Sequence, residues 1–224
     1  MMTSIIERLE AVFGVPRPGP KRNPLDVLIE TILSQSTTDI NSRRAFLQLK
    51  RRFADWQQAR RARAQTIADA IRQAGLANIK SVRIKRVLQR IHARCGSLDL
   101  DCLRRMPLDD AKAFLTSLEG VGPKTAACVL LFGCRRPVFP ADTHILRVAK
   151  RLGVVPPACS AARAHELLGQ LIPSKKYYST HINLIRLGRR YCRPRHPRCV
   201  ACPLLDHCRY AQQASSRLPT EVCA

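Results

Sequence analysis

The stretch Leu118-Glu119-Gly120-Val121-Gly122-Pro123-Lys124-Thr125-Ala126 is the part of this chain that decides its fold. Apolar residues recur at helical spacing on both sides of it, so we predict two helices joined by a very short glycine turn. Both glycines can take a positive φ without a Cβ penalty, and Pro123 suits the first position of a helix. The turn then presents backbone amides at the positive end of a helix, where a phosphate oxygen binds well. An ordinary helix corner with a glycine cap is the simpler alternative.

Two side chains close to this turn are suited to chemistry. Lys124 comes directly after the turn, and its amine can act as a nucleophile once it has lost its proton. Asp142 precedes a helix whose apolar stripe includes Ile145, Val148 and Leu152. The ordinary role of an aspartate in that position is to cap the helix. Its functional role would be to place a carboxylate beside a developing positive charge.

The glycine stretch, followed by Asp142-Thr143-His144, resembles the helix-hairpin-helix and Gly/Pro-Asp signature of the endonuclease III family of DNA glycosylases. The resemblance extends from about Asn23 to Cys208. It implies that Lys124 is the nucleophile and that Asp142 assists base loss. The positions that match the DNA-contacting turn of the family are Gly120, Val121 and Gly122.

The resemblance also implies an all-α fold with two helical lobes and a cleft between them. One lobe would be a helical bundle formed by residues 23–136, which ends with the helix-hairpin-helix motif. The other would combine residues 1–22 with residues 137–224 and carry an iron-sulfur cluster. Because no segment alternates apolar and polar residues over the length of a strand, the sequence pattern by itself also favours an all-α fold.

The family's activity implies a bifunctional DNA glycosylase and AP lyase of base-excision repair. Such an enzyme would extrude an oxidised pyrimidine, remove it, and cleave the abasic site by β-elimination. We expect a monomer whose partner is double-stranded DNA containing damaged bases or abasic sites. Lysine at position 124 argues against the adenine glycosylase of the same superfamily. A monofunctional mismatch or uracil-type glycosylase and a non-catalytic iron-sulfur DNA-binding protein are the alternatives.

Further DNA contacts follow from the same resemblance. Relatives fill the space left by an extruded base with a glutamine, and Gln35 lies in the matching polar segment. A comparison without gaps places Ser36 there instead. Leu76 matches a residue that acts as a wedge toward the opposite strand, although a leucine after the helix-ending Gly75 is more often a packing contact.

Four cysteines near the C-terminus have the pattern C-x6-C-x2-C-x5-C: Cys192, Cys199, Cys202 and Cys208. The first gap is basic and proline-containing and would bury little, so the thiols need something to bind. Four-cysteine zinc sites are common, but they use C-x2-C pairs, and only one such pair is present. A cubane cluster accepts thiolates from uneven loops, and the endonuclease III family has this spacing, so we expect a structural 4Fe-4S cluster. The loop would also offer three guanidinium groups to phosphates, those of Arg193, Arg195 and Arg198.

Charge is the most informative feature of the composition. The chain of 224 residues has 39 Lys and Arg against 16 Asp and Glu, a net charge of +23. Such a charge predicts a polyanionic partner whose binding weakens with salt. There is no long apolar run, so we expect no membrane association. No secretory signal is visible at the N-terminus, and we expect a cytoplasmic location, at the nucleoid if the source is bacterial.

Several helix boundaries are predicted from local patterns. Ser4-Ile5-Ile6-Glu7 has the form of a capping box, and Asn23 is expected to cap a second, buried helix. Asp39 is expected to cap a helix that runs as far as Trp56. Four arginines follow at helical spacing and predict a solvated face that an anionic surface would stabilise: Arg83, Arg86, Arg90 and Arg94. The segment from Gln212 onward is expected to be a frayed tail.

Overall fold

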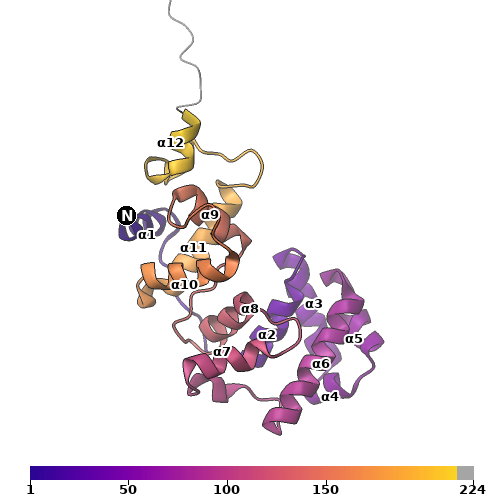
Figure 1. Cartoon of the computed structure of the whole chain (residues 1–224). Coiled ribbons are helices and arrows are strands. Elements are labelled where there is room, and N and C mark those ends of the chain that lie inside the picture. The colour runs from indigo at the N-terminus through magenta and orange to yellow at the C-terminus, as the bar shows by residue number, and fades with distance from the viewer. Residues whose placement is uncertain (216–224) are drawn as a thin grey trace, which may run out of the picture. The chain divides into compact units, whose positions relative to one another are not determined.

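The computed structural model describes residues 1–215, with side chains up to residue 213. Every regular element in this part of the chain is helical, as predicted (Figure 1). No helix among the described residues is both long and apolar enough to cross a membrane. The contacts divide the chain into two compact units. We call residues 20–136 the hairpin unit, and residues 1–19 with those from 137 onward the cysteine unit.

The hairpin unit consists of consecutive helices that pack mainly around α2. Its elements are α2 (Pro24–Leu33), α3 (Asp39–Arg52), α4 (Trp56–Arg61), α5 (Ala64–Ala70), η1 (Arg72–Ala74), α6 (Ala77–Cys95), η2 (Asp101–Arg104), α7 (Leu108–Thr116), α8 (Pro123–Cys128) and η3 (Val129–Gly133). The helix α2 is buried over most of its surface and packs against α3, α6, α8 and η3. It is therefore the central helix that its nearly continuous apolar sequence predicted.

The start of α2 follows from local chemistry. The side chain of Asn23 accepts hydrogen bonds from the N–H groups of Leu25, at 2.8 Å, and Asp26, at 3.4 Å. Pro24 occupies the first turn, where a missing N–H costs nothing. The predicted cap is thus confirmed.

The next helix differs from the prediction at both ends. Thr38, not Asp39, caps α3, and its hydroxyl accepts from the N–H of Asn41 at 3.3 Å. The helix ends at Arg52, and Trp56 begins the separate helix α4. The Trp56 indole N–H donates to Asp26 at 2.8 Å. A tertiary contact with α2 therefore fixes Trp56, and the helical spacing that suggested one continuous helix was misleading.

The cysteine unit is built from the two ends of the chain. Its elements are α1 (Met2–Phe13), α9 (Thr143–Leu152), α10 (Ala161–Leu171), η4 (Ser174–Lys176), α11 (Tyr177–Arg190), η5 (Leu205–His207) and α12 (Arg209–Ser215). The helix α11 packs against both α1 and α9. The unit boundary lies at Pro20, whereas the sequence placed it at Asn23. Helix α12 corrects the prediction of a frayed tail as far as Ser215.

The predicted capping box in α1 is wrong. The helix begins at Met2, so Ser4 lies inside it and makes no cap. The Ser4 hydroxyl instead lies 2.8 Å from Nε2 of His207, which is 203 residues further along the chain. Ile5, Ile6 and Leu9 are buried as the pattern predicted, whereas Val12 is exposed. A long-range contact to the C-terminal segment has taken the place of the local one.

Candidate functional site

The glycine stretch forms a tight turn between α7 and α8. Gly120 has φ +73°, which only glycine adopts without strain, whereas Gly122 is extended, with φ −88° and ψ 178°. The expectation of a positive φ at Gly122 is therefore wrong. The first hydrogen bond of α8 runs from the Ala126 N–H to the Gly122 carbonyl, at 3.0 Å. The N–H groups that precede Ala126 have no partner within the helix, as at any helix start.

Val121 has a structural place in this turn. Its side chain is buried, and its N–H donates to the Leu118 carbonyl at 3.1 Å. That amide is already satisfied inside the turn. The backbone around Gly122 and the first turn of α8 is therefore better suited to an incoming phosphate.

The turn is braced from α6 by Arg83. An added Cβ at Gly120 would lie only 2.0 Å from Nε of Arg83, so the guanidinium lies directly against the glycine. Arg83 donates to Oε1 of Gln35 at 2.6 Å, and the Gln35 amide donates to the Gly120 carbonyl at 3.3 Å. The α2–α3 loop, the turn and α6 thus form one hydrogen-bonded network. The structure places Gln35 in that network, where its side-chain oxygen accepts from Arg83 and its side-chain nitrogen donates to Gly120.

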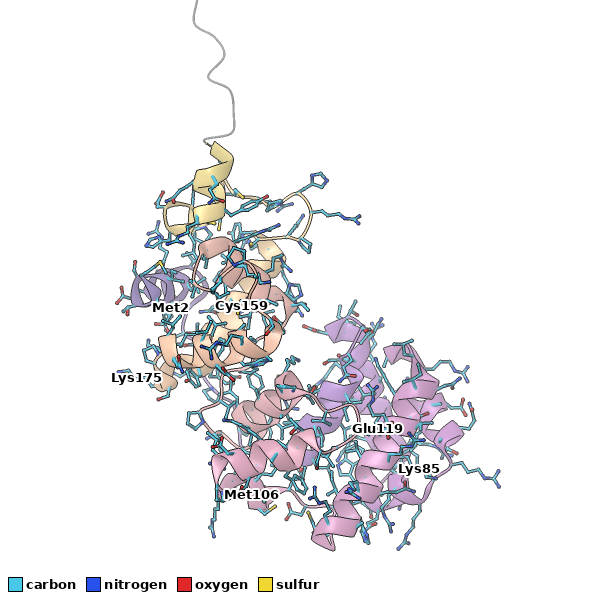
Figure 2. The ribbon with its side chains drawn as sticks, viewed as in Figure 1. Met2, Lys85, Met106, Glu119, Cys159 and Lys175 are labelled. Atoms are coloured by element: carbon cyan, nitrogen blue, oxygen red, sulfur yellow. The ribbon has the colours of Figure 1, made fainter. Side chains whose placement is uncertain are left out.

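Two further arginines of α6 also reach this region. Arg86 binds both carboxylate oxygens of Glu119, at 2.9 and 3.0 Å. Figure 2 shows Glu119 in the turn between α7 and α8. Arg94 donates to the Ser117 hydroxyl at 2.7 Å and lies over the ring of Phe114. Three of the four arginines are exposed, as the prediction of a solvated face requires, and the same face of α6 also supports the hairpin.

Ser36 and Leu76 are exposed and have an unusual backbone. Both have left-handed φ values, 53° and 50°, although neither is a glycine. The Leu76 side chain is 55% exposed, so the packing-contact interpretation of this leucine is wrong. Left-handed backbone costs a bulky residue free energy and often occurs at functional positions.

Lys124 is the second residue of α8 and is half-buried. Its amine makes no ion pair with any carboxylate among the described residues. The side chain begins at the positive end of the helix, beside the backbone proposed for phosphate contact. The amine is therefore not held by an internal partner in the part of the chain that the structure describes.

Asp142 belongs to the cysteine unit and caps α9, as its ordinary role predicted. Its Oδ1 accepts from the N–H of Ile145 at 2.8 Å, which leaves the second oxygen available. Two histidines hold the preceding backbone. Nδ1 of His181 lies 2.9 Å from the Pro140 carbonyl, and Nδ1 of His165 lies 3.1 Å from the N–H of Ala141. The carboxylate is therefore fixed at a rigid helix start.

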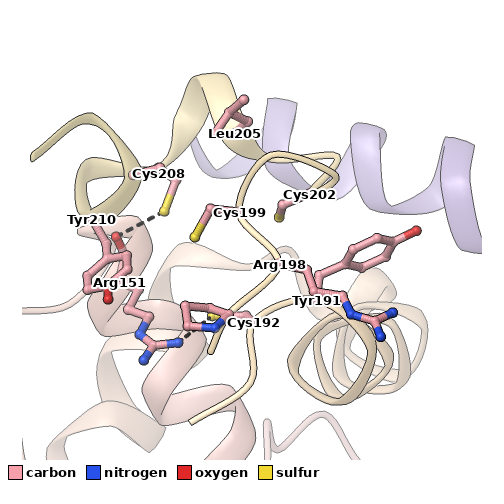
Figure 3. Close-up of a pocket in the computed structure, with 11 residues that line it drawn as sticks. Arg151, Tyr191, Cys192, Arg198, Cys199, Cys202, Leu205, Cys208 and Tyr210 are labelled. Carbon is pink, nitrogen blue, oxygen red and sulfur yellow. Dashed lines mark hydrogen bonds between the residues drawn. The ribbon is translucent and has the colours of Figure 1, made fainter. Parts of the chain in front are cut away.

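The four predicted cysteine ligands line one pocket together with Arg151 and Tyr210 (Figure 3). Burial raises the pKa of the Cys202 thiol, and the three neighbouring thiols raise it further. Among the described residues, no three His, Cys, Asp or Glu side chains gather as ligands of a single metal ion. Tetrahedral zinc would need all four sulfurs about 2.3 Å from one point. Four thiols that share a pocket without converging on one point fit a multinuclear group better than a single zinc ion.

An arginine of α9 clamps the loop that carries these cysteines. Arg151 donates to the carbonyls of Arg193, at 2.6 Å, and Pro194, at 3.1 Å, and lies 3.4 Å from the Cys192 sulfur. Its guanidinium also stacks 4.7 Å from the ring centroid of Tyr210 (Figure 3). This leaves the side chains of the three predicted phosphate contacts exposed: Arg193, Arg195 and Arg198.

The other described cysteines are not joined by disulfides. Cys128, Cys134 and Cys159 are buried, Cys95 is partly buried, and Cys102 is exposed. Cys223 lies outside the described residues.

Comparison with known proteins identifies the family. A family model described as "HhH-GPD superfamily base excision DNA repair protein" matches residues 29–174, well over half of the chain. The chain belongs to this superfamily. Within it, the chain is 37% identical over 196 residues to endonuclease III of Sulfolobus acidocaldarius, covering 86% of this chain and 84% of that protein. The predicted resemblance to the endonuclease III-like glycosylases is confirmed.

Two further HhH-GPD comparisons bear on the site. A putative DNA glycosylase of Arabidopsis thaliana is 39% identical over 165 residues, 74% of this chain, and the chain spans about half (56%) of that protein. A structure titled as a trapped endonuclease III–DNA covalent intermediate superposes with a TM-score of 0.82 at 26% identity. The match covers 96% of this chain and 99% of that one. The hairpin and the cysteine loop therefore lie within a fold shared along nearly the whole chain.

Sequence patterns did not identify several residues that organise this HhH-GPD site. Arg147 and Arg151, one helical turn apart on α9, both bind backbone around Cys192. Their spacing indicates that both arginines have partners in the fold, because like charges at i and i+4 of a helix otherwise repel each other. His165 and His181 gave no such signal, since a single histidine in a helix is usually part of the core.

The two glycines of the turn give a matched pair of tests for phosphate contact. Gly122→Val should fold, because an added Cβ meets no atom within 4 Å and the backbone is extended. It should bind duplex DNA about tenfold more weakly, because it loses one charge-assisted hydrogen bond that contributes about 1.5 kcal/mol to binding. Gly120→Ala should instead lower stability by about 2 kcal/mol, from the left-handed φ and the collision with Arg83. Unchanged affinity of folded Gly122→Val in a fluorescence-anisotropy titration would contradict the phosphate contact.

Proposed function

We propose that this HhH-GPD protein is a bifunctional DNA glycosylase and AP lyase that removes oxidised pyrimidines from double-stranded DNA as a monomer. The observation that carries the proposal is Lys124 in the first turn of α8, two residues after the exposed backbone of Gly122. A phosphate held at that backbone would bring the sugar of an extruded nucleotide near the amine. A protein that only binds DNA would use such a lysine as a phosphate contact, so covalent trapping of DNA distinguishes the two functions.

The proposed reaction divides its work between Lys124 and Asp142. The neutral amine of Lys124 attacks C1′ of the extruded nucleotide, and the damaged base departs with the glycosidic electron pair. Asp142 stabilises the positive charge that develops at the sugar while this bond breaks. Opening of the sugar then leaves a Schiff base between Lys124 and the sugar, and β-elimination cuts the strand on the 3′ side. This scheme requires Lys124 and Asp142 to reach the same bound nucleotide.

Other contacts in the proposal concern the duplex around the extruded base. Gly120 and Gly122 belong to the phosphate-binding turn, and Ser36 and Leu76 are the exposed residues suited to enter the base stack. For Gln35 we retain a role in DNA binding through the hairpin that it supports. The cysteine loop contributes phosphate contacts from its three exposed arginines. We also propose that the protein works where DNA is found, in the cytoplasm and at the nucleoid if the source is bacterial.

We further propose that the cysteine pocket holds a 4Fe-4S cluster. Supporting it are the spacing of the four thiols and their arrangement around a single pocket. When bound, the cluster supplies four bonds that tie the end of α11 to the C-terminal segment. The chain's own contribution is the Arg151 clamp, which orders the loop between Cys192 and Cys199.

Replacing one proposed ligand tests the cofactor. Cys199→Ser should lose the broad absorption at about 400 nm that iron-thiolate clusters give, and should lose solubility. Cys102→Ser removes an exposed thiol elsewhere and serves as the matched control. Purified protein with stoichiometric zinc and neither iron nor sulfide after anaerobic preparation would show that the cluster assignment is wrong.

A panel of lesion-bearing duplexes tests the activity itself. Oxidised pyrimidine, uracil, thymine mismatch and preformed abasic sites should be compared for base release and for strand cleavage. The proposal requires base release from the oxidised pyrimidine and cleavage at the abasic site. Base release from uracil or mismatched thymine without cleavage would favour a monofunctional glycosylase, and binding without either reaction would favour a non-catalytic DNA-binding protein.

A further inference from the structure

A buried lysine connects the two helix ends that lead to Ser36 and Leu76, two of the exposed residues with left-handed φ in the hairpin unit. Lys80 is only 1% exposed, and its Nζ donates to the carbonyls of Leu33 and Ala74, both at 2.8 Å. Leu33 ends α2, three residues before Ser36, and Ala74 ends η1, two residues before Leu76. One ammonium thus connects two helix ends whose residues lie 47 and 6 positions from it in the sequence.

The chemistry of this contact is that of a fixed cross-link. Terminal carbonyls of a helix carry the negative end of its dipole and attract a cation. An ammonium placed in the protein interior costs free energy unless it is hydrogen-bonded, and the two carbonyls supply that compensation. Burial lowers the pKa of Lys80, and the nearby Arg83 lowers it further. Removing the amine would leave both carbonyls without this partner and both loops without their shared anchor.

Ser36 and Leu76 are the tips of two loops, and their left-handed backbone shows why these loops need an anchor. A left-handed φ at leucine persists only where the surroundings over-determine it, and the exposed Leu76 side chain gains little from packing. The α2–α3 loop, which carries Ser36, is also tied to the hairpin through Gln35 and Gly120. Within one unit, therefore, the two tips and the proposed phosphate-binding turn are held in fixed relation.

We propose that Lys80 is a positioning residue that holds Ser36 and Leu76 as a rigid pair for entry into the base stack when a nucleotide is extruded. Proteins that unstack DNA insert apolar side chains between base steps and must supply a few kcal/mol to do so. A loop tip that moves freely cannot unstack the bases, because the loop would change conformation before the bases separate. This proposal rests on the proposed function, since it requires a duplex from which a base is extruded.

Fluorescence of 2-aminopurine placed beside a lesion tests the role of Lys80, because unstacking increases its emission. Lys80→Met should keep duplex affinity within about twofold while lowering the fluorescence increase about tenfold, with a matching fall in kcat for base release rather than a rise in KM. Leu76→Ala should give the same loss. Lys85→Met is the matched control, because Lys85 on the same helix also donates to a loop carbonyl, that of Ala62 at 2.7 Å (Figure 2).

Lys80→Arg gives a second measurement should Lys80→Met fail to fold. It keeps the charge, but its bulkier head group cannot hold both carbonyls in the same geometry, so the fluorescence increase should fall several-fold in a protein that melts normally. A wild-type signal from folded Lys80→Met or Lys80→Arg, while Leu76→Ala loses it, would overturn the positioning role alone. An equal loss of the fluorescence increase in Lys85→Met would also overturn the positioning role. Wild-type protein that binds duplex without unstacking it would overturn the proposed function as well.

Discussion

Lys124→Ala is expected to abolish the covalent adduct that borohydride traps between wild-type protein and abasic-site DNA. Strand cleavage should fall by about 10³-fold or more, because no other residue replaces a missing nucleophile. Binding of the lesion duplex should survive, since the proposed phosphate contacts come from the backbone of the turn and from the arginines of the cysteine loop. The measurement is a gel that separates the trapped adduct from free DNA.

A second lysine of the same unit is the control for Lys124. Lys112 on α7 is partly exposed and pairs with Asp109 at 3.0 Å, so Lys112→Ala removes the same charge from a lysine that already has an internal partner. Lys112→Ala protein should form the borohydride-trapped adduct at the wild-type level. Wild-type protein that releases bases without any trapped adduct would disprove the nucleophile and indicate a monofunctional glycosylase that uses activated water.

Asp142→Asn is expected to slow base release by about 10²–10³-fold, which is typical for the loss of one electrostatic contact to a transition state. Asparagine caps a helix as well as aspartate does, so the fold should be unaffected. Cleavage of a preformed abasic site should fall much less, because no glycosidic bond remains to be broken. Single-turnover rates on a lesion duplex and on an abasic duplex measure the two steps separately.

Asp55 provides the matched substitution for Asp142. It caps α4 by accepting from the N–H of Gln58 at 2.8 Å, so Asp55→Asn changes the same chemical group in the same structural role. Its rates should stay at the wild-type level. An equal fall in both steps for Asp142→Asn would mean that the residue positions DNA and does not stabilise the developing charge.

Features that depend on a few neighbouring residues were predicted well from the sequence. Asn23 caps α2 because its side chain reaches amides only two and three residues away. The glycine turn was also predictable, since Pro123 and the two glycines restrict the backbone locally. The four cysteines were identified because their spacing is itself a property of the sequence.

Features that depend on contacts across the fold were not predictable. The Ser4 pattern indicated a cap, but its hydroxyl lies against His207, a contact that no local pattern encodes. Lys80 sits in a strongly basic helix, where every lysine is first assumed to be solvated, and only the packed structure shows it buried. The pairing of Lys124 with Asp142 rests on the family resemblance and not on any local pattern.

The arginines behind the hairpin limit how much of the chain's charge can reach a nucleic acid. Arg86 is paired with Glu119, whereas Arg83 and Arg94 donate to the neutral Gln35 and Ser117. Each of the three guanidinium groups therefore has a protein partner with which an approaching phosphate would compete. Each phosphate that the protein neutralises contributes about −0.9 to the slope of log affinity against log salt. That slope, and not the net charge of +23, therefore gives the number of phosphates that the protein neutralises on DNA.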